Sequence, residues 1–195
     1  MNLKGVFTRK ILGLTIVLVV FLSLAPVFTF KATASFPSAR IMPLGDSITV
    51  GYPGPTFDSY RKDLYSNLTN FGFNVNFVGS QNNGTGSDND NEGHNGYTAD
   101  MISANVSKWL TNYPADVVLL HIGTNDIQNG ESLTDIVTDV KGILDKIDAW
   151  GVSNSRSVTV VLARIILRSD NSTWNQTTMD YNNKLESMAS SRGNV

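Results

Sequence analysis

The sequence predicts an α/β fold built on a parallel sheet. Patterns typical of strands alternate with patterns typical of helices from residue 40 onward. Residues 116–122 form a near-continuous apolar run, as expected of a central parallel strand buried on both faces. Residues 133–151 carry apolar side chains at helical spacing and end at a glycine. These observations favour buried strands joined by helices that cover them.

In the first half of this region, residues 40–44 are expected to form a short strand. Residues 59–71 are expected to form a helix, because apolar residues recur at helical spacing and Gly72 follows as a natural stop. Residues 73–79 alternate like a second strand. The apolar positions of the helix are Tyr60, Leu64, Leu68 and Phe71.

In the second half, three helices and two strands are expected. Ser132 with Asp135 resembles a capping box at the start of the helix that runs to Gly151. Residues 116–122 and 157–162 are the third and fourth strands. The other two helices are marked by Ile102, Val106 and Leu110 and by Met179, Asn182, Leu185 and Met188. We expect residues 194–195 to begin another strand, so that the last strand and helix of the fold follow this chain.

The first 34 residues resemble an export signal. A basic start precedes the apolar stretch 11–30, and Ala32-Thr33-Ala34 gives a small-x-small cleavage site. A domain of residues 35–195 would then be secreted, without stable membrane association after cleavage. The alternative is an uncleaved anchor, because about twenty apolar residues can span a bilayer.

Charge and cysteine content exclude several partners. The formal net charge is −2 at pH 7, and loss of the basic residues of the signal would lower it to −6, which argues against nucleic-acid binding. The chain contains no cysteine, so it forms neither a disulfide nor a cysteine metal site. We expect a monomer stabilised by its core alone. The basic residues of the signal are Lys4, Arg9, Lys10 and Lys31.

Three polar motifs follow the expected strands in order. Ser47 comes directly after the first strand, Gly96 lies in the loop after the second, and Asn125 follows the third. Ligands of open parallel sheets bind beyond the C-terminal ends of the strands. We therefore expect these three residues to meet along one edge of the sheet.

These residue types suit acyl transfer from an ester. Such a reaction needs a nucleophile and N–H donors aimed at the oxygen that becomes negative in the tetrahedral intermediate. The Ser47 hydroxyl would attack, and its backbone N–H is one candidate donor. Gly96 would add a backbone N–H, and Asn125 a side-chain N–H.

The order of these motifs resembles the SGNH hydrolases, also called GDSL esterases and lipases. The motifs are Gly45-Asp46-Ser47, Gly96 and Gly123-Thr124-Asn125-Asp126. The stretches 92–97 and 119–126 are most similar to carbohydrate esterase family three, whose members deacetylate xylan. The resemblance covers residues 40–195 and implies a three-layer α/β/α sandwich with a flavodoxin-like parallel sheet.

One part of the family pattern is not found in this chain. SGNH hydrolases carry a C-terminal Asp-x-x-His, in which the histidine is the general base and the aspartate orients it. His94 and His121 both precede the expected position, so neither is assigned as the base. We expect the motif to follow Val195 and this chain to show low activity, because triad members act as a unit.

The loop around Gly96 also supplies candidate substrate-binding residues. His94 could contact the substrate or brace the loop. Tyr97, like Tyr52 and Trp174, could stack on a sugar or serve as packing.

Nearby polar residues are expected to have structural roles. His121 lies within an apolar run, which favours a packed, hydrogen-bonded core histidine. Asp46 and Asp126 are expected to hold their turns, with Arg61 or Arg164 as partners of such carboxylates.

Residues 88–93 resemble the start of a calcium loop. Its twelfth position is Ala99 rather than a glutamate, which excludes an EF-hand. A weaker calcium site and a solvated acidic loop remain the alternatives. No metal ligand is assigned and no organic cofactor is expected.

The resemblance implies a secreted serine esterase that removes acetyl groups from a polysaccharide such as xylan through an acyl-Ser47 intermediate. One alternative is a lipase or lysophospholipase of the same superfamily, with an apolar acyl tunnel. The other is a catalytically degenerate carbohydrate-binding protein.

Overall fold

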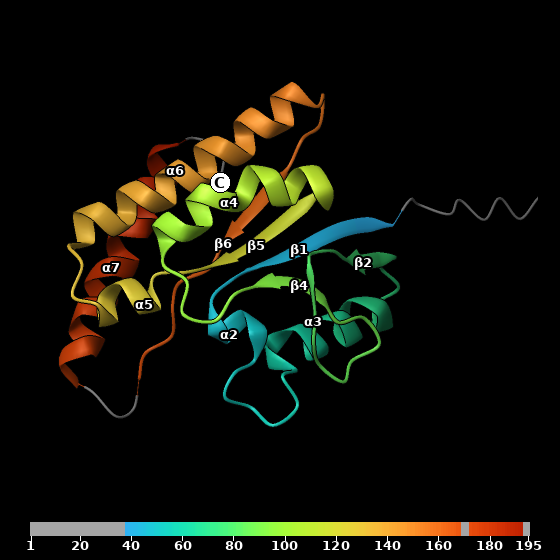
Figure 1. The fold of residues 1–195 in the computed structure, drawn as a ribbon, viewed down its shortest axis with the longest axis horizontal. Helices are drawn as coiled ribbons and strands as arrows, with labels where there is room; N and C mark the ends of the chain where they lie inside the picture. Colours follow the sequence, from blue (N-terminus) through green and yellow to red (C-terminus); the bar gives the residue numbers. More distant parts are fainter. Residues whose placement is uncertain (1–37, 169–171, 193–195) are drawn as a thin grey trace, which may run out of the picture. The chain divides into compact units, whose positions relative to one another are not determined.

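A mixed, mostly parallel sheet forms the centre of the fold (Figure 1). The computed structural model describes residues 38–168 and 172–192, so the expected export signal lies outside the described residues. The strand order is β3-β4-β1-β5-β6. The sixth strand, β2, pairs with the start of β1. All pairs are parallel except β3 with β4. The strands are β1 (Ala39–Gly45), β2 (Val75–Phe77), β3 (Gln81–Asn82), β4 (Asp90–Gly93), β5 (Val117–His121) and β6 (Thr159–Leu162).

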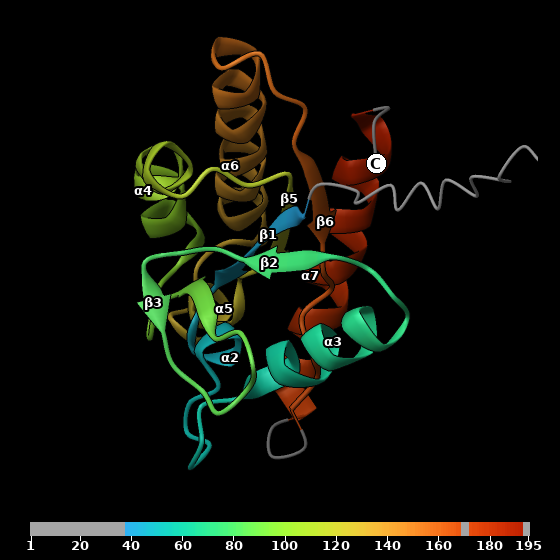
Figure 2. The ribbon, with the colours of Figure 1, turned by 90° about the vertical axis from the view of Figure 1, so that its right-hand side faces the viewer.

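Helices flank this sheet in a three-layer α/β/α arrangement. The paired helices α4 and α6 cover one face and α3 lies on the other, as Figures 1 and 2 show. Helix α7 contacts α5 and α6. The helices are α2 (Ser47–Val50), α3 (Ser59–Asn70), α4 (Ala99–Asn112), α5 (Thr124–Gln128), α6 (Leu133–Ser153) and α7 (Ser172–Ser191). None of the helices in the described part of the chain has the length and hydropathy needed to cross a bilayer.

The core lies between the sheet and the α4–α6 layer. Helix α6 begins where expected, because the Ser132 side chain accepts a hydrogen bond from the Asp135 N–H at 3.1 Å. Its apolar stripe then packs against α4 and the central strands. The buried residues of this cluster include Met42, Leu44, Ile102, Val106, Leu110, Val118, Leu120, Ile136, Val140, Ile143 and Ile147.

Strand β1 shares one of its edges between two strands. Its start pairs with β2 at residues 39–41, and its end pairs with β4 at residues 44–45. Ile41 and Gly45 accept backbone hydrogen bonds from this side, so Pro43, which alternates with them, faces the same side. The nitrogen of Pro43 therefore faces the gap between β2 and β4. It carries no hydrogen, so this position leaves no backbone donor unpaired.

The polar segment 82–95 is rich in Asn, Gly and Ser, a composition that predicts a long surface loop, but the structure differs. It contains β4 and the end of β3, so the sheet has six strands rather than four, and one pairing is antiparallel. Strand β4 has the sequence Asp-Asn-Glu-Gly, which carries no apolar alternation. It forms because Leu44 and Gly45 offer a free length of strand edge beyond β2.

Candidate active site

Three strands end side by side at the place where the polar motifs begin. Gly45 is the last residue of β1, and it pairs with Gly93 of β4 on one side and His121 of β5 on the other. Ser47, Gly96 and Asn125 follow these three residues by two, three and four positions. The structure therefore brings the three predicted loops to one edge of the sheet. Their roles as nucleophile and N–H donors remain predictions.

Ser47 is the first residue of α2 and is half-buried. The helix begins there because Asp46 has an extended conformation and its side chain accepts a hydrogen bond from the Ile48 N–H at 2.9 Å. Gly45 allows the close approach of β5, since a Cβ at this position would lie 2.2 Å from the His121 carbonyl oxygen. The tight Gly-Asp-Ser sequence thus places Ser47 at the N-terminal end of a short helix.

Gly96 lies at the exposed tip of the loop after β4. Its φ is +77°, in the left-handed region that favours glycine, and a Cβ there would meet no atom within 4 Å. The backbone conformation rather than crowding therefore explains the glycine. An exposed N–H at this edge of the sheet fits the predicted donor role.

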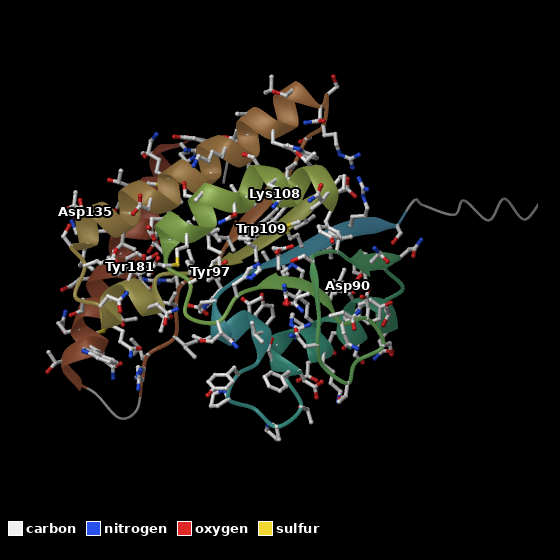
Figure 3. All side chains as sticks on the ribbon, in the orientation of Figure 1. Asp90, Tyr97, Lys108, Trp109, Asp135 and Tyr181 are labelled. Carbon is white, nitrogen blue, oxygen red and sulfur yellow. The ribbon has the colours of Figure 1, made fainter. Side chains whose placement is uncertain are left out.

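The side chain of His94 braces this loop. Its ring stacks on Tyr97 and on Trp109, with centroids 4.6 Å and 4.7 Å apart, and its Nε2 lies 2.7 Å from Glu92 Oε1. Figure 3 shows Tyr97 and Trp109 close together between α4 and the loop. Glu92 is fully buried and also accepts hydrogen bonds from Ser80. A direct substrate contact of His94 or Tyr97 remains a prediction.

Asn125 connects α5 to the same loop. Its side-chain Nδ2 donates a hydrogen bond to the Tyr97 carbonyl oxygen at 2.8 Å. The preceding Gly123 has φ +119°, and a Cβ there would lie 2.6 Å from the ring of Tyr181. The Tyr181 hydroxyl in turn donates to the Ile122 carbonyl at 2.9 Å. Helix α7 therefore holds the turn that positions Asn125.

Two buried carboxyl groups lie beneath the site. Asp46 and Asp126 are both fully buried, and burial raises the pKa of each to about 6. Hydrogen bonds from Ile48 to Asp46 and from Ala99 to Asp126 act in the opposite direction. Asp126 thereby fixes the start of α4, at 2.8 Å from the Ala99 nitrogen. These contacts agree with the structural roles expected for both residues.

The expectation for His121 was only half correct. The residue is buried in the sheet, but neither ring nitrogen has a hydrogen-bond partner among the described residues. Burial lowers the pKa of His121, so its neutral form is favoured. Within the described part of the chain, no histidine is hydrogen-bonded to Ser47, and the structure assigns no general base.

The sequence-based expectation that Arg61 or Arg164 pairs with Asp46 or Asp126 is wrong. Arg164 Nη2 lies 3.6 Å from Glu186 Oε2 instead, and Arg61 has no carboxylate partner among the described residues. Arg61 is 1% exposed, and its guanidinium donates only to backbone carbonyl oxygens from three separate segments. The acceptors are Thr49, Val50, Phe57, Asn83 and Asn89, at 2.7–3.1 Å. Burial lowers the pKa of this guanidinium. The sequence signal that could have identified Arg61 is its place among otherwise apolar positions on α3.

The aspartates of the acidic loop accept hydrogen bonds within the protein, Asp88 from a backbone N–H and Asp90 from the side-chain amide of Asn82. Asp88 Oδ2 accepts a hydrogen bond from the Phe77 N–H at 2.7 Å. Among residues 38–168 and 172–192, no three acidic or histidine side chains are grouped in a way that could hold a metal ion. A calcium site in this loop remains a prediction without ligands assigned.

A cavity of about 660 Å³ lies away from these residues. It is found beside the start of β6 and is lined by α6 and α7, whereas Ser47 follows the end of β1. Its lining includes Leu144, Ile147, Val158, Val160 and Ala189. The cavity is therefore not an acyl tunnel leading from Ser47.

Comparisons with known proteins show what this chain is similar to. A family model described as the GDSL-like lipase/acylhydrolase family matches residues 44–195. A multidomain esterase of Ruminococcus flavefaciens is 32% identical over 124 residues, which is 51% of this chain and 16% of that protein. This chain therefore spans only a small part of that relative.

Solved structures show the same fold. A family 3 carbohydrate esterase of Clostridium thermocellum has a TM-score of 0.71 and 33% identity, and the match covers 81% of this chain and 74% of that one. A protein of the G-D-S-L family from Desulfitobacterium hafniense has a TM-score of 0.58 and 17% identity, and the match covers 80% of this chain and 74% of that one. The second comparison supports the fold alone.

Proposed function

Because this chain belongs to the GDSL-like lipase/acylhydrolase family, we propose that it is a secreted serine esterase that removes O-acetyl groups from a polysaccharide of the xylan type. Membership of the family supports ester hydrolysis as the reaction. The carbohydrate substrate is supported by the similarity to the family 3 carbohydrate esterase. The single observation that carries the site is the row Gly93–Gly45–His121, which brings the three polar loops together.

In the proposed reaction, the Ser47 oxygen attacks the acetyl carbonyl carbon and forms a tetrahedral intermediate. The N–H groups of Gly96, Asn125 and Ser47 stabilise its negative oxygen. The carbon–oxygen bond to the sugar then breaks, and the sugar leaves as an alcohol with the proton that Ser47 gave up. Water hydrolyses the acetyl-Ser47 ester to acetate in the second half of the reaction.

The proton needs a general base to carry it between Ser47 and the sugar oxygen. His94 Nε2 is engaged by Glu92, and the His121 ring is buried in the sheet. We propose that the base is the histidine of an Asp-x-x-His motif that follows Val195. No organic cofactor enters this scheme, and the protein is proposed to act as an extracellular monomer.

Acetate release from acetylated xylan tests the proposal. Ser47→Ala should abolish release, whereas Ser66→Ala, an exposed serine on α3, should leave it unchanged. Release that survives Ser47→Ala would sink the mechanism. The assay uses both this chain and a gene product extended beyond Val195, because the extension should raise the rate.

A comparison of acyl chain lengths separates this proposal from a lipase. The proposed enzyme should prefer acetyl esters to esters of long fatty acids. A preference for long acyl chains would support the lipase alternative. Binding of xylan without any Ser47-dependent hydrolysis, even in the extended product, would support a degenerate binding protein.

A further inference from the structure

The loop of residues 51–58 lies directly after the helix that carries Ser47. It extends away from the sheet below α2 (Figure 1). The Tyr52 N–H donates to the Ser47 carbonyl oxygen at 3.0 Å, so the loop starts within one helical turn of the proposed nucleophile. A polymer whose ester reaches Ser47 would have neighbouring units on the surface around α2, where this loop begins.

Two aromatic side chains are exposed on this loop. Tyr52 is 56% exposed and Phe57 is 37% exposed. Their rings stack with centroids 6.4 Å apart and an interplanar angle of 30°. Pro53, Pro55 and Thr56 between them are also exposed. Residues 52–57 carry no charged side chain, so this part of the loop presents an uncharged aromatic surface.

The loop is held rigidly at its base. Arg61 donates to the carbonyl oxygen of Val50, directly before the loop, at 3.1 Å and to that of Phe57, near the end of the loop, at 2.7 Å. Gly51 and Phe57 are in close contact, since a Cβ on Gly51 would lie 2.7 Å from the Phe57 carbonyl carbon. Loops with such closely joined ends are often functional. Its buried anchor therefore fixes the position of the aromatic pair relative to Ser47.

The conformation of Phe57 is also unusual. Its φ is +55°, which is rare for a bulky side chain and costs conformational free energy. Phe57 does not belong to the buried core, so core packing does not offset this cost. Residues held in such conformations by their surroundings are concentrated at binding and catalytic sites.

We propose that Tyr52 and Phe57 form a binding platform for pyranose rings of the polysaccharide, next to the ester-cleaving site. The negative face of an aromatic ring attracts the C–H groups on the flat face of a sugar. This inference rests on the proposed carbohydrate substrate. It assigns recognition of the sugar chain to the loop and cleavage of the ester to Ser47.

Binding of acetylated xylo-oligosaccharides, measured by calorimetry on the full chain, tests the platform. All variants carry Ser47→Ala so that the esters are not consumed. Tyr52→Ala and Phe57→Ala should each weaken binding by about three- to tenfold. Tyr52→Trp and Phe57→Tyr keep a ring and should retain binding. Phe71→Ala and Tyr113→Ala, which remove exposed aromatic rings elsewhere, should have no effect.

A second arm uses the same oligosaccharides after chemical deacetylation. The ratio of the dissociation constant of each alanine variant to that of the Ser47→Ala parent should stay the same, because the platform contacts the sugar ring rather than the acetyl group. The platform is disproved if the alanine variants bind as tightly as the two controls, if the ratio disappears on deacetylation, or if the parent binds no oligosaccharide. Failure of the esterase proposal is recognised separately, by acetate release that does not depend on Ser47.

Discussion

The side-chain amide of Asn125 donates a hydrogen bond to the main-chain carbonyl of Tyr97 at 2.8 Å. This bond joins the start of α5 to the loop that contains Gly96. An amide nitrogen carries two hydrogens, so one can hold the loop while the other serves the oxyanion. Two of the proposed oxyanion donors, Asn125 and Gly96, are therefore held in place by a shared contact.

Asn125→Asp should lower kcat/KM for acetyl esters by about 100-fold or more, because it removes a donor and adds a negative charge next to the oxyanion. Asn129→Ala, at the exposed end of the same helix, should leave kcat/KM unchanged. Steady-state kinetics on a soluble acetyl ester provide the measurement. An Asn125→Asp variant as active as the parent would remove Asn125 from the oxyanion hole.

Gly123→Ala should destabilise the protein more than Gly130→Ala. Both residues have positive φ, so both substitutions carry a backbone cost of roughly 1–2 kcal/mol. Only at Gly123 would the new Cβ collide with Tyr181, whereas Gly130 has no atom within 4 Å of that position. The collision should add about 1–3 kcal/mol. Urea unfolding of the two variants measures the difference, and equal losses would contradict the packing argument.

Arg61→Met should reduce the free energy of unfolding by about 3 kcal/mol or more, since it leaves several buried carbonyl groups without a donor. Arg61→Lys should recover only part of this loss, because an ammonium has three donors and no planar fork. Arg164→Met is the control: Arg164 is exposed, and its loss should cost less than about 0.5 kcal/mol. Chemical denaturation measures all three, and a mild effect of Arg61→Met would show that water replaces the guanidinium.

The stability that Asp46 and Asp126 contribute should fall as the pH rises from about 4 to about 6. Asp46 and Asp126 have pKa values raised from 3.8 to about 6 in the folded state, so the folded protein binds more protons than the unfolded chain in this window. Each group contributes at most about 3 kcal/mol to the decline. Asp126→Asn keeps the oxygen that accepts from Ala99 and should become more stable relative to the parent over this range. Parallel stability curves for the two proteins would show that Asp126 is not perturbed.

Much of the fold could be predicted because its main elements carry a periodic apolar signal. The buried strand β5 and the capped helix α6 are examples, and both occur where expected. Strand β4 could not be predicted in this way, because its pairing depends on an edge of β1 that the local sequence does not reveal.

The motifs of the candidate site could be predicted from the sequence. The contacts that hold the surrounding loops in place could not. Ser47 and Asn125 belong to ordered sequence motifs that follow strands. The stacking of His94 on Trp109 joins residues on different elements, and Arg61 donates to backbone groups, which have no sequence signature. Such contacts depend on the tertiary fold and leave no periodic pattern.

Pro43 also helps to fix the register of β2 and β4 along β1. A one-residue slip of a strand would turn its apolar side chains to the wrong face, but a slip of two residues would preserve the alternation. Such a slip of β2 or β4 along β1 would bring a carbonyl group opposite a nitrogen that cannot donate. The proline therefore opposes the misalignment that hydrophobic patterning tolerates, and so protects the row of strand ends on which the loops of Ser47, Gly96 and Asn125 depend.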